Sequence, residues 1–416
     1  MKRHFLFVQA PFGEFSKRLA ARLRSGGHRV TRVILNGGDL HNWGFAEAHF
    51  FLGRTERYRD WIAYLLKREV VSDVISYGDG HYYTEVALEE AKALGLRLAC
   101  LEQGYLRPNW VTLELDGVNG NSSLPDNPSF YRRFGIPLSE LPDAHVILGN
   151  ITRNNVLNIT AYSFLLYFLA PFFPFYRLPV YMPGYVTGLA HLFRYYIDKL
   201  QRGQAARDQA HILSLQAPFF LGIMQRPGDS QLVKHSEFPE VRFFYRAAIE
   251  SFARNAPAES HLLFKCHPLD QGFSGHARGI RQNARQMGVA GRVHFLNGGS
   301  LAPLVRKSVG VITVNSTAGL AALNFGTKCK TLGKAIYNIE GLTFQGPLDS
   351  FWQSQNMPDK DLFLRFRQLM VEMTQVLGSF STKDGVALAV ETIAKRLIGG
   401  LPTPQSMEAV RLSKTV

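Results

Sequence analysis

The chain has 416 residues, of which 46% are hydrophobic and 19% are charged. This composition describes a folded globular protein and excludes general disorder, and the length predicts two domains, since it exceeds one ordinary core. The net charge of +14 suits nucleic acid, an anionic membrane surface or an acidic substrate, and equally a protein that is basic without such a partner. No zinc finger or other nucleic-acid-binding motif is present, so we expect no nucleic-acid partner.

The first half of the chain alternates short β-rich runs with helical runs, which predicts parallel βαβ units. The apolar run that ends before Gln9 is interpreted as a first buried strand and not as a signal peptide. The expected strands are 5–8, 30–35, 74–77 and 98–101, and the expected helices are 15–23 and 85–94.

Polar residues follow these predicted strands, and the carboxyl ends of strands are where open α/β sheets bind ligands. The residues are Gln9, Asn36, Asp39, Asp79 and Glu102. Each is also an ordinary turn residue. Their recurrence at successive strand ends predicts one shared crevice.

A segment without charged side chains runs between Arg153 and Arg177. Its apolar part, 161–176, is shorter than a spanning helix needs and contains two prolines. Aromatic residues flanked by Arg177, Arg194 and Lys199 are typical of a membrane interface, and a buried hairpin between domains is the alternative. We expect an aromatic membrane-interface segment near 155–195.

A second α/β rhythm begins near residue 206, with expected strands at 212–215, 219–224, 261–266, 293–296 and 309–314. The predicted fold class is α/β with two Rossmann-like domains in a GT-B-like glycosyltransferase architecture. The predicted domains are 1–205, which holds the acceptor and catalytic groups, and 206–416, which binds the nucleotide. The final helices are expected to pack back on the first domain.

Two polar turns in the second half could hold a phosphate group. One is Asn315-Ser316-Thr317, where a predicted strand gives way to a helix, and the other is Lys265-Cys266-His267-Pro268. Helix starts and hydroxyl groups bind anions, although Ser, Thr and Asn are also common helix caps. The chain contains no P-loop, no dinucleotide-binding glycine motif and no zinc-ligand spacing, so we expect no metal and no cofactor.

Glu102 and Asp116 supply carboxylates in the first half, and glycosyl transfer uses such groups as nucleophile or general acid/base. The cysteines Cys100, Cys266 and Cys329 lie far apart in apolar surroundings, which predicts reduced core residues and a reducing compartment.

Several segments together resemble the capsule polysaccharide biosynthesis family, specifically its Kdo transferase that is usually paired with a longer, two-module Kdo transferase. In the first half they are Asn36-Gly37-Gly38-Asp39, Glu102-Gln103-Gly104-Tyr105-Leu106-Arg107-Pro108 and Asp116-Gly117-Val118-Asn119-Gly120. In the second half they are Asp229-Ser230-Gln231, His267-Pro268-Leu269-Asp270, Val314-Asn315-Ser316-Thr317-Ala318-Gly319 and Gly346-Pro347-Leu348-Asp349-Ser350-Phe351-Trp352.

The resemblance implies an enzyme that transfers Kdo from CMP-Kdo to lysophosphatidylglycerol with retention, which starts the poly-Kdo linker of a capsular polysaccharide. It implies a cytoplasmic protein, peripheral on the inner face of the inner membrane. Its expected partners are an anionic lipid acceptor, the longer transferase and the capsule export complex. A CMP-sialic acid transferase on the same scaffold and a non-catalytic export scaffold remain alternatives.

From the motifs we assign the site residues as follows. Asp116 is the expected nucleophile and Glu102 the expected acid/base. Asp116 is preferred as the second carboxylate because Gln103 occupies a position where related transferases often have an acidic residue. The expected donor-binding residues are Gln225, Asp229, Ser230, Lys265, His267, Pro268, Asn315, Ser316 and Thr317. The expected acceptor or sugar residues are Gln9, Asn36, Gly37, Asp39, Asp79, Arg107 and Asn119.

Overall fold

The computed structural model describes residues 2–138, 140, 148–149, 153–177, 203–268, 270 and 275–412, without the side chains of 154, 230 and 410–412. The chain divides into two compact units. The first comprises Met1–Leu124, Leu138–Val186 and Gln368–Val416, and the second comprises Pro125–Pro137 and Thr187–Arg367. The C-terminal segment from Gln368 thus belongs to the first unit and not to a domain that runs from 206 to 416. Residues 178–202, which include the rest of the predicted interface segment, lie outside the described residues.

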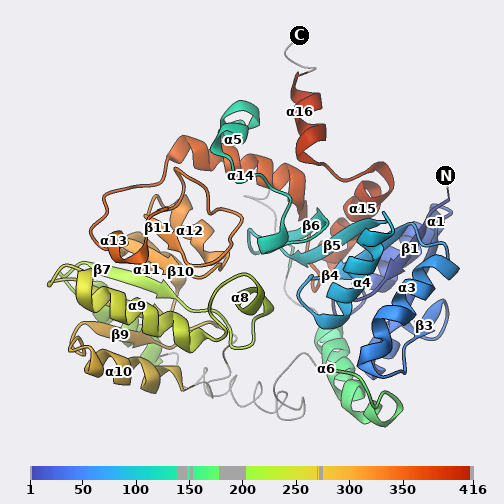
Figure 1. Ribbon diagram of the computed structural model, residues 1–416, viewed down its shortest axis with the longest axis horizontal. Helices are drawn as coiled ribbons and strands as arrows, with labels where there is room; N and C mark the ends of the chain where they lie inside the picture. The colour runs from blue at the N-terminus through green and yellow to red at the C-terminus, as the bar shows by residue number, and fades with distance from the viewer. Residues whose placement is uncertain are drawn as a thin grey trace. The chain divides into compact units, whose positions relative to one another are not determined.

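The first unit is built on a seven-stranded sheet with the order β12-β6-β5-β4-β1-β2-β3 (Figure 1). Its strands are β1 (His4–Phe7), β2 (Arg29–Ile34), β3 (Ala48–Phe50), β4 (Asp73–Tyr77), β5 (Arg97–Gln103), β6 (Trp110–Leu115) and β12 (Gln375–Leu377). The strands from β5 to β3 are all parallel, whereas β6 runs antiparallel to β5 and β12 antiparallel to β6. Fully buried β1 explains the continuous apolar run at the start of the chain, because parallel strands are covered on both faces.

The helices described in this unit are α1 (Phe15–Ser25), α2 (Gly37–Trp43), α3 (Tyr58–Arg68), α4 (Tyr82–Ala93), α6 (Arg153–Phe168), α15 (Lys383–Gly399) and α16 (Pro404–Leu412), with 3₁₀ turns at Thr55–Arg57, Asn119–Asn121 and Ala170–Phe172. Two of them, α1 and α15, share a core with one face of the sheet, and α3 and α4 share a core with the other. Although they are far apart in the sequence, α1 and α15 lie side by side (Figure 1). Buried Phe15 and Leu19 share one core with Ile393, and Arg22 pairs with Glu391 at 2.7 Å. This packing places the C-terminal helix in the first unit.

The second unit is built on a five-stranded parallel sheet with the order β11-β10-β7-β8-β9. Its strands are β7 (Phe219–Ile223), β8 (His261–Lys265), β9 (Val293–Leu296), β10 (Gly310–Thr313) and β11 (Cys329–Thr331). Its helices are α5 (Pro128–Phe134), α8 (Ser230–Lys234), α9 (Val241–Asn255), α10 (His276–Gln286), α11 (Leu301–Lys307), α12 (Ala318–Asn324) and α13 (Leu348–Phe351). Helix α14 (Lys360–Thr374) contains the division between the units.

The core on one face of this second sheet is aromatic. Phe244 and Phe252 of α9 pack with Phe220 and Phe264 of the strands and with Trp352. The prediction of a strand at 212–215 is wrong, since residues 203–214 are helical and the Lys307 ammonium donates to the backbone oxygens of Leu213 and Leu215. The apolar residues there follow a helical spacing with one buried side, which a short apolar run cannot distinguish from a strand. The fold class, α/β with two Rossmann-like units, is confirmed.

Candidate functional site

The strand order of the second sheet reverses between β7 and β10, and polar side chains from both strand ends meet there. Gln225 follows β7 and Asn315 follows β10, and the Gln225 Nε2 donates to the Asn315 Oδ1 at 2.7 Å. Asn315 in turn donates to the backbone oxygen of Gln231 at 2.8 Å. Ligands of open α/β sheets bind at such reversal points. The structure therefore brings together two of the predicted donor-binding residues at the position where a ligand is expected.

Lys265 ends β8 and lies in register with Ile223 on β7, which in turn pairs with Thr313 on β10. Its side chain is 5% exposed, and burial lowers the pKa of its ammonium. In the part of the chain that the structure describes, this ammonium makes no hydrogen bond or ion pair, and the Gln225 Oε1 is buried without a partner. A positive charge on a largely buried side chain, without a counter-charge among the described residues, makes this end of the sheet suited to an anionic ligand.

The turn after β10 contains Ser316 and Thr317, and the side chain of Tyr337 packs against its backbone. The Tyr337 hydroxyl donates to the backbone oxygen of Ser316 at 2.5 Å, and Gly319 makes room because a side chain there would collide with the Tyr337 ring. The Ser316 Oγ accepts from the Ala318 N–H at 3.3 Å, whereas Thr317 makes no side-chain cap. The Thr317 hydroxyl is therefore not committed to capping α12.

The remaining predicted donor residues lie on loops of the same unit. His267 is half-buried after β8, and its backbone oxygen accepts from the Asp270 N–H at 3.0 Å, which closes the turn through exposed Pro268. Asp229 caps α8 by accepting from the Gln231 N–H at 3.0 Å. The side chain of Ser230 lies outside the described residues. Asp229 thus holds α8, whose Gln231 contacts Asn315.

In the first unit, Glu102 lies near the end of β5, and Asp79, Gln9 and Asn36 follow β4, β1 and β2; the four strands are adjacent and parallel. The sheet order reverses between β4 and β1, so Asp79 and Gln9 flank the reversal point. The Gln9 Oε1 accepts from the Thr84 hydroxyl at 2.8 Å. The structure therefore places these four residues along one sheet edge, as the strand-end pattern predicts.

Asn36, Gly37 and Asp39 have structural roles that the sequence did not reveal. Asp39 is buried beside Arg32 at 2.7 Å, and burial raises the pKa of its carboxyl. Asn36 caps α2 by accepting from the Asp39 N–H at 2.9 Å. Gly37 lets the backbone of α6 approach, since a side chain there would collide with the Leu165 oxygen. The Asn-Gly-Gly-Asp motif is therefore the surface on which α6 packs.

Glu102 and Asp116 are not brought together. The two strands β5 and β6 are antiparallel, and Glu102 lies opposite Thr112, whereas the Asp116 N–H donates to the Leu98 oxygen at the start of β5. Four residues of strand separate the two backbones by about 13 Å. Asp116 is exposed and has a positive φ of 67°, a conformation typical of a turn.

The loop after Asp116 folds back over the sheet and returns to Asp79. The Asp79 Oδ2 accepts from the Val118 N–H and from the Asn121 Nδ2, both at 3.0 Å. The Asn119 N–H donates to the Tyr105 hydroxyl at 2.7 Å. The predicted residues Asp79 and Asn119 are thus brought together, and exposed Arg107 lies on the hairpin that also carries Tyr105.

Helix α6 leaves a row of large apolar side chains exposed on the side away from α2. Phe164 and Phe168 of α6 are 62% and 64% exposed, and their rings stack at 5.4 Å; Phe172, in the 3₁₀ turn that follows α6, is 71% exposed. Among the described residues, no helix is long and apolar enough to cross a membrane. The segment packs on α2 by one side and presents aromatic rings on the other.

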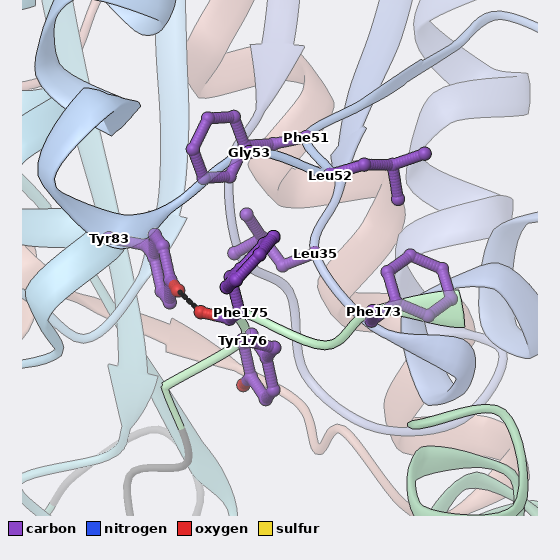
Figure 2. Close-up of a pocket in the computed structure, with 8 residues that line it drawn as sticks. All are labelled: Leu35, Phe51, Leu52, Gly53, Tyr83, Phe173, Phe175 and Tyr176. Atoms are coloured by element: carbon purple, nitrogen blue, oxygen red, sulfur yellow. Dashed lines mark hydrogen bonds between the residues drawn. The ribbon is translucent and has the colours of Figure 1, made fainter. Parts of the chain in front are cut away.

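Aromatic and aliphatic side chains pack around the end of the aromatic segment (Figure 2). Tyr176 stacks on Tyr83 with ring centroids 5.5 Å apart, and the Tyr83 hydroxyl donates to the Phe175 oxygen at 3.4 Å. The lining residues are Leu35, Phe51, Leu52, Gly53, Tyr83, Phe173, Phe175 and Tyr176. This packing holds the segment 173–176 on the first sheet.

Comparison with known proteins identifies the family. The model of the family described as "Capsule polysaccharide biosynthesis protein" matches residues 72–381. The chain is 31% identical to the capsule polysaccharide export protein KpsS of Escherichia coli over 376 residues, which cover 90% of this chain and 96% of KpsS. It is 30% identical to the capsule polysaccharide modification protein LipB of Neisseria meningitidis over 387 residues, which cover 91% of each chain.

A solved structure of Thermosulfurimonas dismutans KpsC, titled a beta Kdo 2,7 transferase, is similar with a TM-score of 0.44 and 12% identity, over 96% of this chain and 99% of that one. The family assignment depends on the sequence matches, which extend over most of the chain and include the motif segments of both units. The chain belongs to the capsule polysaccharide biosynthesis family.

Proposed function

We propose that the protein is a glycosyltransferase that transfers Kdo from CMP-Kdo to lysophosphatidylglycerol with retention, and so starts the poly-Kdo linker of a capsular polysaccharide. Family membership and the motif resemblance support the pathway and the choice of sugar. The second unit would bind the CMP moiety, and the first would provide the carboxylates and the acceptor groups. No metal or cofactor takes part in this proposal.

The burial of Lys265 is the observation that supports binding of the sugar donor, CMP-Kdo, to the second unit. Its buried ammonium lies at the carboxyl end of the second sheet, near the reversal point occupied by Gln225 and Asn315. A nucleotide phosphate would supply the missing negative charge, and fixed donors in a water-poor site stabilise charge that develops on a leaving phosphate. The Ser316 and Thr317 hydroxyls and the His267 ring would add hydrogen-bond donors to the same phosphate.

Retention requires one carboxylate to attack the anomeric carbon, with departure of CMP, and then an acceptor hydroxyl to displace that carboxylate from the sugar. Glu102 is suited to act on the sugar because it is half-buried beside the reversal-point residue Asp79, at the edge where ligands bind. Asp116 lies at the opposite end of β5. We therefore propose Glu102 as a catalytic carboxylate and leave the identity of the nucleophile, Glu102 or Asp116, to adduct mapping.

The exposed face of α6 supports a peripheral position on the inner face of the inner membrane, where a lysolipid acceptor would be presented. Aromatic residues without acidic neighbours suit the headgroup region, and Arg153 and Arg177 at the ends of the segment suit anionic lipid. The longer Kdo transferase and the capsule export complex would act after this protein in the proposed pathway.

The direct test is to incubate the purified protein with CMP-Kdo and lysophosphatidylglycerol and to measure the mass of the lipid product by mass spectrometry. A product heavier by one Kdo residue is expected, with CMP released in equal amount. Transfer from CMP-sialic acid in place of CMP-Kdo would support the sialic acid alternative. No transfer from either donor would favour an export scaffold.

A further inference from the structure

Glu114 is a buried carboxyl that none of the assigned roles uses. It lies on β6 opposite Cys100 of β5 and is 2% exposed. Its Oε1 accepts a hydrogen bond from the Tyr105 hydroxyl at 2.5 Å, and its Oε2 accepts one from the Ser122 hydroxyl. Burying a carboxyl group costs free energy unless it is hydrogen-bonded, and these two hydrogen bonds offset that cost for Glu114.

The two partners of Glu114 belong to two separate loops. Tyr105 lies in the hairpin 104–109, which connects β5 to β6 and begins two residues after Glu102. Ser122 lies in the loop that begins at Asp116 and returns over the sheet. The Tyr105 hydroxyl also accepts from the Asn119 N–H at 2.7 Å, so hairpin, strand and loop are joined through one carboxyl and one phenol.

We propose that Glu114 is a positioning residue, whose carboxyl holds the Glu102–Arg107 hairpin and the Asp116–Asn119 loop in one fixed arrangement for sugar transfer. This inference rests on the proposed function, because it assumes that the two loops contact the sugar or the acceptor. Glu114 lies beneath the two loops and contacts each of them, but it is not proposed to contact the sugar or the acceptor itself. It acts through Tyr105 and Ser122, and a small shift of groups that hold a substrate can cost two orders of magnitude in rate.

Titration of Glu114 gives this role a measurable signature. Burial raises the pKa of its carboxyl to about 7, against the effect of the Ser122 and Tyr105 hydrogen bonds, and the Asp79 carboxylate raises it further. The titratable groups that face it are Tyr105 from the hairpin, Asp79 from the loop after β4, and Cys100, which lies opposite it on β5. A rate step near pH 7 should therefore accompany its ionisation.

The sign of the stability effect follows from the same pKa. Glu114 binds its proton more tightly in the folded protein than in the unfolded chain, so its contribution favours folding at low pH and is lost as the pH rises through about 7. Glu114→Gln, which resembles the neutral acid, should lack this part of the pH dependence and should be more stable than the wild type at neutral pH, where the wild type has lost it.

The test measures Kdo transfer, CMP affinity and unfolding for the wild type, Glu114→Gln, Tyr105→Phe and Ser122→Ala, with exposed Glu56→Gln as the matched control. Above pH 7, where the Glu114 carboxylate accepts from both hydroxyls, Glu114→Gln should lower kcat about tenfold or more, while CMP affinity and the folded fraction do not fall. Its rate profile should lack the step near pH 7. Tyr105→Phe and Ser122→Ala should each lower kcat in the same direction, and Glu56→Gln should match the wild type.

Two results would overturn the inference. If the wild type transfers Kdo and Glu114→Gln has the same kcat and the same pH profile, Glu114 does not position the loops. If the loss of rate in Glu114→Gln only follows a loss of folded protein and of CMP binding, the role is stability alone. Failure of the proposed function is distinguishable, because the wild type itself would then transfer no Kdo.

Discussion

Gln225 and Asn315 join the two halves of the second sheet through a 2.7 Å hydrogen bond at the point where the strand order reverses. The bond fixes both amides, and it leaves the Gln225 Oε1 buried and without a partner among the described residues. A buried acceptor without a partner is uncommon in folded proteins, so a ligand that donates a hydrogen bond there would remove a penalty. The cytosine amino group of CMP is such a donor.

Asn315→Ala is expected to weaken CMP binding, because it frees Gln225 and removes the contact with the Gln231 oxygen. The loss of a neutral hydrogen bond corresponds to about 0.5–1.5 kcal/mol, which is roughly a threefold to tenfold increase in Kd. Isothermal calorimetry with CMP measures it, and Gln282→Ala on an exposed position of α10 is the control. An unchanged Kd would remove the Gln225–Asn315 pair from the nucleotide site.

Lys265 should make CMP binding depend on pH. Burial lowers the pKa of its ammonium, so deprotonation as the pH rises removes the charge that attracts phosphate, and CMP affinity should fall toward alkaline pH. Lys265→Met should weaken CMP binding by about 1.5–3 kcal/mol at neutral pH and flatten this dependence. Calorimetry between pH 7 and pH 10 tests both, with exposed Lys67→Met as control. Equal pH slopes in Lys265→Met and the wild type would contradict the assignment.

The nucleophile can be identified by trapping. If transfer proceeds by double displacement, rapid quenching with CMP-Kdo and no acceptor should leave a Kdo-sized mass on one peptide. We expect the adduct on the peptide that contains Glu102, since Asp116 lies about four residues away along β5. Peptide mass spectrometry after quenching decides between them, with Glu56→Gln as a variant that should still label. An inverted product without any adduct would exclude double displacement.

The exposed face of α6 should bind anionic vesicles. Phe164→Ser with Phe168→Ser should reduce vesicle binding, because two apolar rings no longer enter the headgroup region, and high salt should reduce it further. Phe45→Ser is the control, since Phe45 is also strongly exposed but lies outside the segment. Vesicle flotation measures the bound fraction. Equal binding of the double variant and of Phe45→Ser would exclude α6 as the lipid-facing surface.

Gly37→Ala should destabilise the first unit, because its new methyl group would collide with the backbone oxygen of Leu165 on α6. Overpacking of this kind costs about 1–3 kcal/mol of the free energy of unfolding. Chemical denaturation measures the change. Gly399→Ala at the end of α15, where a methyl group meets no atom within 4 Å, should leave the stability nearly unchanged. A similar stability for both variants would show that α6 accommodates the methyl group.

The sequence by itself determined the fold class and the strand-end positions of the polar residues. Alternating buried runs and amphipathic helices depend on local spacing, so they are readable along the chain. The places of Gln9, Asp79 and Glu102 at one edge follow from the same pattern, because parallel strands end together. Lys265 and Asn315 at the carboxyl ends of β8 and β10 were found in this way.

Only the tertiary structure decided which of these groups meet and what each side chain contacts. Because β6 runs antiparallel to β5, the end of β6 places Asp116 at the start of β5 and not beside Glu102. The direction in which two strands pair depends on contacts that local periodicity does not encode. The burial of Asp39 beside Arg32 and of Glu114 beneath two loops likewise depends on residues distant in the sequence. The free-energy cost of burying a carboxylate depends on those distant neighbours. For this reason Asp39 forms an ion pair, Glu114 joins two loops and Glu102 is a candidate catalyst, although the sequence alone does not distinguish them.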